Sequence, residues 1–131
     1  MIVRQVNPIF IHRLWVDYSA VSTIVGWSSF TVNKIYTKQI GKIVFVNFDI
    51  EGVSNSINTS FTVPYISAVN PGSHRGQIGL TFDNGSALAT PGAFYLPAGG
   101  NIVTLYKDSA LTGWTASGNK YVLGRFWYEM V

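Results

Sequence analysis

The chain has no cysteine among its 131 residues, which excludes disulfide bonds, cysteine-ligated zinc and thiol catalysis. It also has almost no apolar pattern with the helical period. Residues 1–16 have the layout of neither a signal peptide nor a membrane span, because polar residues and a proline interrupt them: Arg4, Asn7, Pro8, His12 and Arg13. We therefore expect synthesis in a cytoplasm without a signal peptide, and no membrane insertion.

Charged residues are scarce, at 11% of the chain against ~25% in ordinary soluble domains. Serine, threonine, asparagine and glycine fill the polar positions instead. Either an oligomer hides much of the surface, or the surface faces an exterior where neutral polar groups suffice. The nine basic residues form no dense stripe along the chain, which argues against a nucleic-acid partner.

Short alternating runs separated by turn residues predict β-strands along most of the chain. Residues 33–40 and 42–50 flank Gly41 as a hairpin, and the strand 77–82 leads into the Asp-Asn-Gly turn 83–85. Further strands are expected at residues 13–19, 23–27, 61–65, 102–106 and 120–130. Nine or ten short strands at regular spacing predict an all-β fold, an antiparallel β-sandwich of jelly-roll type.

Candidate catalytic residues are few. Asp49 and Glu51 lie two apart in one predicted strand, so their carboxylates point the same way and could serve a glycosidase as acid and base. The same pair also fits a solvated strand end, because a polar loop begins at Gly52. His12 and His74 are far apart, and the chain has no nucleophile elbow and no phosphate-binding glycine loop. We expect no enzyme, no cofactor and no bound metal.

Each of the four tryptophans must lie in the core, in an interface or against a ligand. We expect Trp27, at a strand end, in the core, and Trp127 in a last strand that is buried on both faces. Trp114 differs, because it lies in a loop among Thr, Gly and Ser residues. Two interpretations of Trp114 remain open: its ring stacks on a sugar, or it folds back over the sandwich as a lid.

Residues 17–129 resemble a pattern at the ends of bacteriophage tail-fibre and other phage adhesion proteins. The motifs occur here in the family's order, as Gly26–Trp27, then Tyr36, Lys38, Gly41 and Lys42, then Val44 to Phe48, Gly52 to Ser56, and Phe61 to Pro64. The later segments DNGSALATPG, NIVTLYKD and GWTASGNKYVLGRFWYE are similar to the second half of the same family. The order of the motifs carries the likeness.

The resemblance implies a receptor-binding knob, a trimeric β-sandwich at the tip of a virion fibre that attaches the phage to glycans of its host. Residues 1–16 fall outside the pattern and would be a linker or docking segment, with the knob at 17–131. The partners would be further copies in a homotrimer, other tail or fibre proteins, and bacterial surface polysaccharide. No catalysis is implied.

For a saccharide site we expect loop residues that offer a ring, hydrogen bonds or charge: Trp114, Asn119, Asp83, Asn84, His74 and Arg75. Two alternatives remain open. The chain could be a structural virion protein, a capsid-decorating or fibre-assembly piece that has the same fold but no sugar site. It could also be a glycan-degrading enzyme that acts through Asp49 and Glu51.

Overall fold

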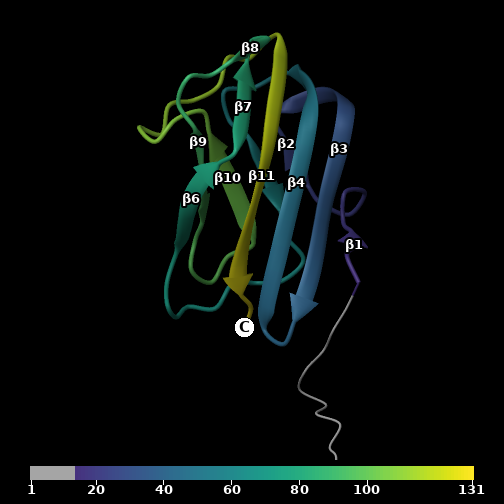
Figure 1. Cartoon of the computed structure of the whole chain (residues 1–131), viewed down its shortest axis with the longest axis vertical. Coiled ribbons are helices and arrows are strands. Elements are labelled where there is room, and N and C mark those ends of the chain that lie inside the picture. The colour runs from purple at the N-terminus through teal and green to yellow at the C-terminus, as the bar shows by residue number, and fades with distance from the viewer. Residues whose placement is uncertain (1–13) are drawn as a thin grey trace, which may run out of the picture.

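The computed structural model describes residues 14–131, which form eleven β-strands and no helix. Two antiparallel sheets pack together as a β-sandwich (Figure 1). The six-stranded sheet has the order β1 (Val16–Asp17), β3 (Trp27–Ile40), β4 (Ile43–Ser54), β11 (Asn119–Glu129), β7 (Leu80–Asp83) and β8 (Ser86–Ala87). The five-stranded sheet has the order β2 (Ile24–Val25), β5 (Ser60–Thr62), β10 (Ile102–Tyr106), β9 (Gly92–Leu96) and β6 (His74–Ile78). The expected all-β antiparallel sandwich is confirmed, and its jelly-roll type stays a prediction.

Val16, the last residue of the expected linker, pairs with Thr37 of β3. The division into a linker and a knob stays a prediction. Residues 1–13 of the expected linker lie outside the described residues. A helix long and apolar enough to cross a membrane does not occur in the described part of the chain.

The predicted hairpin around Gly41 is the longest strand pair of the molecule (Figure 1). β3 and β4 pair from Ile40 opposite Ile43 to Trp27 opposite Ser54. Gly41 has a φ of 59° in the tight turn between them, a conformation that costs glycine little because it has no Cβ. The second predicted turn is also confirmed, with Asn84 and Gly85 at φ 51° and 80° between β7 and β8.

Alternation along β4 divides the core from the outer face of the six-stranded sheet. Val44, Val46, Phe48 and Ile50 are each no more than 1% exposed and face the five-stranded sheet. They meet buried residues of the opposite layer: Phe61, Phe94, Leu96, Val103 and Leu105. Full burial of each such side chain stabilises the fold by roughly 1.5–3 kcal/mol. Trp27, at 7% exposure, joins this core as predicted.

The outer face of β11 corrects one prediction. Trp127 is 56% exposed, so the last strand is not buried on both faces. The inner face of β11 does belong to the core, through Val122, Phe126 and Tyr128. Bulky residues on both faces of a strand were therefore not a sufficient sign of double burial, because an outer sheet face can expose large rings.

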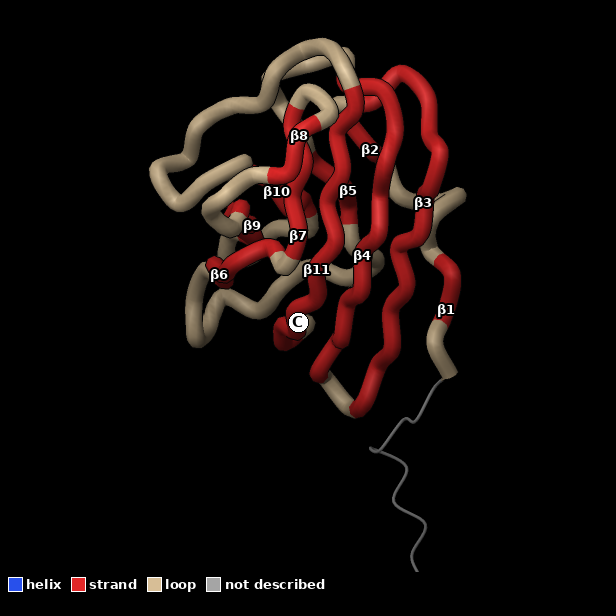
Figure 2. The backbone as a smooth tube through the Cα atoms, turned by 45° about the horizontal axis from the view of Figure 1, so that its top comes forward, coloured by secondary structure: helices blue, strands red, loops and turns tan. Residues whose placement is uncertain are grey.

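The chain changes sheets at Gly79, between β6 and β7, which follow one another beside β11 (Figure 2). β7 pairs with β11 only from Tyr121 to Leu123, whereas β4 pairs with β11 along its whole length. From Gly124 onward, β11 has no paired β7 residue at its side. The six-stranded sheet is thereby narrower over this stretch, which leaves room for a groove on its outer face.

Candidate functional site

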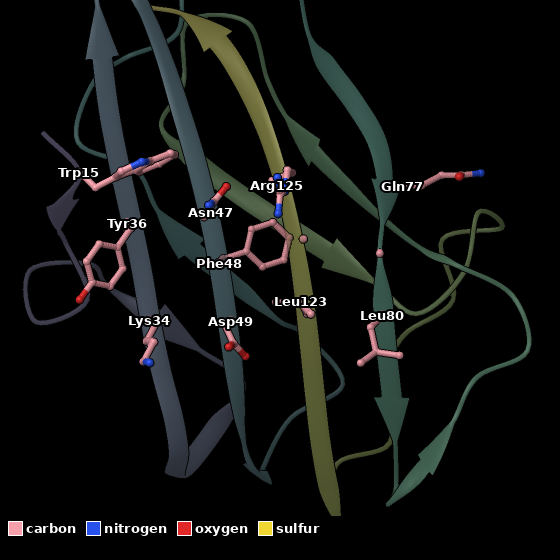
Figure 3. A pocket seen from close by; sticks show the side chains of 12 residues that line it. Trp15, Lys34, Tyr36, Asn47, Phe48, Asp49, Gln77, Leu80, Leu123 and Arg125 are labelled. Atoms are coloured by element: carbon pink, nitrogen blue, oxygen red, sulfur yellow. The ribbon is translucent and has the colours of Figure 1, made fainter. Parts of the chain in front are cut away.

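An open groove of about 820 Å³ crosses the outer face of the six-stranded sheet. It runs from the segment before β1, across β3, β4 and β11, to the link between β6 and β7 (Figure 3). The groove is lined by Trp15, Lys34, Tyr36, Asn47, Phe48, Asp49, Gln77, Gly79, Leu80, Leu123, Gly124 and Arg125. Its volume lies within the range of roughly 300–1,000 Å³ that is common for ligand sites.

Cross-strand register arranges most of the lining side chains in two rows. Each member of a row is paired with its neighbour on the next strand. The first row reads Lys34, Asp49, Leu123 and Leu80, and the second reads Tyr36, Asn47 and Arg125. Residues two apart in a strand share a face, so the two rows lie side by side and both point away from the core.

Apolar groups lie near both ends of the groove, together with Lys34 at one end and Gln77 at the other, and Asn47, Asp49 and Arg125 lie between them (Figure 3). At one end Trp15, 43% exposed, accompanies the half-buried Tyr36. At the other end Leu123 and Leu80 are 39% and 38% exposed. A ligand in the groove would make apolar contact at each end and would meet Asp49 and its polar neighbours in the middle.

Gly124 deepens the floor of the groove. A Cβ on this residue would lie 2.6 Å from Cζ of Phe48, so the phenyl ring occupies the space that a side chain would need. Glycine at position 124 thus lets Phe48 pack beneath β11 and leaves no side chain there to fill the groove. A larger residue would force the ring out of the core.

Asp49 is the electrostatic centre of the groove. Its Oδ1 atom is buried and has no hydrogen-bond partner, although Lys34 lies directly across from it on β3. Lys34 and Arg125 are free of ion pairs, since the pair of Lys107 with Asp83 is the one salt bridge among residues 14–131. A buried acceptor without a partner costs about 1–3 kcal/mol. Burial and the nearby Asp49 carboxylate raise the pKa of the Tyr121 hydroxyl. A ligand hydroxyl would remove the cost at Oδ1 if a small shift of the side chain exposed this atom to the groove.

Trp114 requires a correction. Its indole is 2% exposed, and the ring nitrogen donates a hydrogen bond of 2.9 Å to the carbonyl oxygen of Leu105. A ring buried in this way has no free face for a sugar, so the stacking interpretation is wrong and the lid interpretation describes the loop. The surrounding small residues misled the prediction, because burial of Trp114 depends on β10 and not on its neighbours in sequence.

Asp83 has a structural role in the same region. Its carboxylate, 7% exposed, accepts hydrogen bonds from Lys107 Nζ at 3.0 Å and from Thr115 through its amide at 3.0 Å and its hydroxyl at 2.8 Å. Burial raises the pKa of Asp83, but these hydrogen bonds outweigh it and hold the pKa below its usual value. Asp83 therefore fastens the loop between β10 and β11 to the end of β7.

Asn84 and Asn119 lie beside Asp83 at this end of the sandwich. Asn84 is exposed in the turn, and the amide of Gly85 donates to the carbonyl oxygen of Asn119 at 2.8 Å. The side-chain amide of Asn119 donates to Glu51 Oε2 at 3.2 Å. The structure thus brings four predicted residues together, and of these only Asn84 is freely exposed.

His74 and Arg75 lie apart from that group, at the start of β6. The His74 ring lies 6.4 Å from the rings of Trp127 and of Tyr128, near the far end of β11. The Arg75 guanidinium lies 4.4 Å from the ring centroid of Tyr95. Asn119 and Tyr128 are separated by about 30 Å of extended strand, so the six predicted residues do not form one site.

None of the six predicted residues lines the groove. A signal for the groove did exist in the sequence, in the polar positions Asn47 and Asp49 that interrupt an otherwise apolar strand. Asp49 was considered as a catalytic acid or as part of a solvated strand end, and its neighbours on β3 and β11 were not identifiable from sequence alone. The pairing of Asp49 with Lys34 and Leu123 supplies that missing information.

Lys120 is a second feature that the sequence did not reveal. The side chain is fully buried, and Nζ donates to the carbonyl oxygens of Gly26 at 2.8 Å and Ser56 at 3.3 Å and to Thr59 Oγ1 at 2.6 Å. Nζ also lies 4.9 Å from the ring centroid of Trp27. Burial lowers the pKa of Lys120 from 10.5 to about 8. Because its ammonium group is buried and hydrogen-bonded, Lys120 cannot reach a ligand. Its contacts stabilise the fold.

We expect the free energy of unfolding to rise as the pH increases from about 8 towards 10. The folded chain loses the Lys120 proton in this interval while the unfolded chain keeps it, and stability rises wherever the unfolded state binds more protons. The trend reverses above pH 10, because burial raises the pKa of Tyr128 well above 10.0. Urea unfolding across this pH range measures the effect. A Lys120→Met control should lack the rise, and a steady fall from pH 8 in the parent chain would contradict the prediction.

Residues 14–131 contain no group of three or more His, Cys, Asp or Glu residues that could hold a metal ion. The residues that line the groove offer hydrogen bonds, charge and ring faces. Comparison of the sequence with models of known protein families and with curated proteins finds no match.

Proposed function

We propose that this chain is a non-catalytic glycan-binding module that takes saccharides in the groove of the six-stranded sheet. The observation that carries the proposal is the unpartnered Asp49 carboxylate oxygen in a groove that has the rings of Trp15 and Tyr36 at one end and free polar groups beside them. A sugar has hydroxyl groups that donate to a carboxylate and apolar C–H faces that pack on aromatic rings. Trp15 and Tyr36 offer the rings, and Asp49 and Arg125 offer the hydrogen bonds.

Within this proposal the module is the receptor-binding part of a phage fibre, and its ligand is a polysaccharide on the bacterial surface. The support is the resemblance of residues 17–129 to phage adhesion proteins. The matching motifs include Tyr36 and the strand 44–48, which contribute to the groove. The module would then be part of the virion and would be joined to other tail or fibre proteins.

Binding without hydrolysis fits the placement of the two carboxylates. Asp49 lines the groove, whereas Glu51 is absent from the lining and accepts a hydrogen bond from Asn119. A glycosidase needs both carboxyl groups at the same bond of the substrate. That only Asp49 lines the groove therefore favours a binding role for Asp49.

We expect Asp49→Asn to weaken glycan binding roughly 10- to 100-fold, since a hydrogen bond to a charged group contributes about 1.5–3 kcal/mol. The substitution preserves shape and removes the charge. Binding of the purified chain to a glycan array identifies the ligand, and calorimetry with that glycan measures the change. Trp15→Ala should weaken binding as well, because it removes the most exposed ring of the groove.

The matched control is Glu51→Gln, on the same strand but outside the groove lining, which should bind like the parent chain. Equal binding by the Asp49→Asn variant would contradict the groove as the site. A folded parent chain that binds neither the array nor bacterial cells would favour the structural virion role. Release of reducing sugar that both variants abolish would favour a glycan-degrading enzyme.

A further inference from the structure

Charge is divided unevenly between the outer faces of the two sheets. The outer face of the six-stranded sheet carries charged side chains on each of its three long strands, among them Lys34, Lys38, Glu51 and Glu129. The five strands of the other sheet contain a single charged residue, Arg75. Of the charged side chains on the two outer sheet faces, all but Arg75 thus lie on the six-stranded sheet.

The strand register shows which residues form the outer face of the five-stranded sheet. One row of paired residues crosses all five strands and reads Val25, Ser60, Thr104, Tyr95 and Arg75. These side chains point outward, because their chain neighbours, including Phe61, Phe94 and Leu105, are buried in the core. Thr104 lies at the centre of the row, on the middle strand of the sheet.

This face differs from an ordinary solvated sheet face. Val25 is 44% exposed and Ile102 is 50% exposed, and Tyr95 and Tyr106 are half-buried beside them. Soluble chains usually place Lys, Glu, Asp and Arg at such positions. The cores of protein interfaces, in contrast, are depleted in charge and enriched in tyrosine.

We infer that the outer face of the five-stranded sheet is the surface through which copies of this chain associate. Like charges that face each other across an interface cost several kcal/mol. Two copies of this face would bring almost no charges together. Its one charge, Arg75, lies on the edge strand β6 and is held over the Tyr95 ring at 4.4 Å. A charged partner would find no complementary charge here, whereas a second copy presents the same neutral surface.

Association through this face leaves most of the groove open, because Gln77 of the edge strand β6 is the one lining residue that belongs to the five-stranded sheet. In the homotrimer that the resemblance implies, the uncharged faces would meet at the shared axis and every groove would point outward. The inference does not depend on the ligand of the groove. A failure of glycan binding and a failure of association are therefore separate results.

Light scattering coupled to size-exclusion chromatography tests the inference. The parent chain should have a mass that is a multiple of 14.4 kDa. Thr104→Lys places a charge at the centre of the face and should reduce the mass to a single chain, and Ser60→Lys should do the same on the neighbouring strand. The matched control is Leu123→Lys, at the centre of the opposite face, which should keep the parent mass.

Circular dichroism distinguishes dissociation from unfolding, since a dissociated variant keeps the parent strand signal. A parent chain that is monomeric at all concentrations overturns the inference. Folded Thr104→Lys and Ser60→Lys variants that keep the parent mass also overturn it. Dissociation by Leu123→Lys in their place would assign the interface to the groove face.

Discussion

Replacement of Trp114 with alanine is expected to lower the free energy of unfolding by about 3–5 kcal/mol, the usual cost of truncating a buried tryptophan. The indole is 2% exposed and belongs to the hydrophobic core. Its loss would leave a cavity and would also leave the Leu105 carbonyl without the 2.9 Å hydrogen bond from the ring. Urea or guanidinium unfolding followed by far-UV circular dichroism measures the change.

Trp127→Ala is the matched control for this prediction. The Trp127 ring is 56% exposed, so its truncation should cost less than about 1 kcal/mol. The comparison separates burial from residue type, because both substitutions remove an indole. A Trp114→Ala variant with parent stability and lost glycan binding would contradict the core assignment and restore Trp114 as a stacking platform.

Lys120→Ala is expected to have a similarly large effect, of about 3–5 kcal/mol. The ammonium group donates to three oxygen acceptors, which belong to Gly26, Ser56 and Thr59. The Gly26 and Ser56 carbonyl oxygens keep donors in the Asn55 amide and the Ser54 hydroxyl, whereas Thr59 Oγ1 loses its one partner among residues 14–131. A buried acceptor left unpaired costs about 1–3 kcal/mol, and truncation of the long side chain adds a cavity. Chemical unfolding near pH 7, where Lys120 is charged, measures the loss.

Lys120→Met separates the two contributions. Methionine fills much of the same volume but offers no donor, so this variant should recover the packing and not the hydrogen bonds. We expect its stability to lie between those of Lys120→Ala and the parent chain. Parent stability in Lys120→Met would show that the hydrogen bonds of the ammonium group contribute nothing net to the fold, as replacement of some buried charges by apolar groups has done elsewhere.

The expected size of the Lys120 effect follows from where its contacts lie. Gly26 lies between β2 and β3, while Ser56 and Thr59 belong to the segment between β4 and β5. Trp27 adds a hydrogen bond of 3.1 Å from its ring nitrogen to the Lys120 carbonyl. One side chain of β11 thus joins two segments that lie more than sixty residues earlier in the sequence.

The predictions that succeeded rest on local rules. Gly41 and the Asn84–Gly85 pair marked turns because positive φ favours glycine and asparagine over other residues. Period-two alternation in residues 42–50 identified the inner face of β4, since neighbouring side chains of a strand point to opposite sides. Both rules act within a few residues, so a single sequence is enough to apply them.

The candidate site could not be predicted in the same way. Trp114 was left open between a sugar platform and a lid, and the Leu105 carbonyl of β10, which accepts its ring N–H, decides for the lid. Asp83 was expected in a saccharide site, but Lys107 and Thr115 of the 107–119 loop donate to its carboxylate. The groove depends on the pairing of Asp49 with Lys34 and with Leu123, seventy-four residues later in the chain. The residues near Asp49 in the sequence do not indicate which distant strand residues pair with it.

By itself, the sequence determined the strand class of the chain, its main turns, the inner face of β4 and the scarcity of charge. Tertiary structure alone decided that β11 lies between β4 and β7, that the chain changes sheets at Gly79, and that the charges gather on one face while the other has Arg75 alone. The physical reason is the range of the interactions. Turns and alternation depend on neighbouring residues, whereas the groove, the Lys120 contacts and the uncharged face depend on which distant strands the core packing brings together.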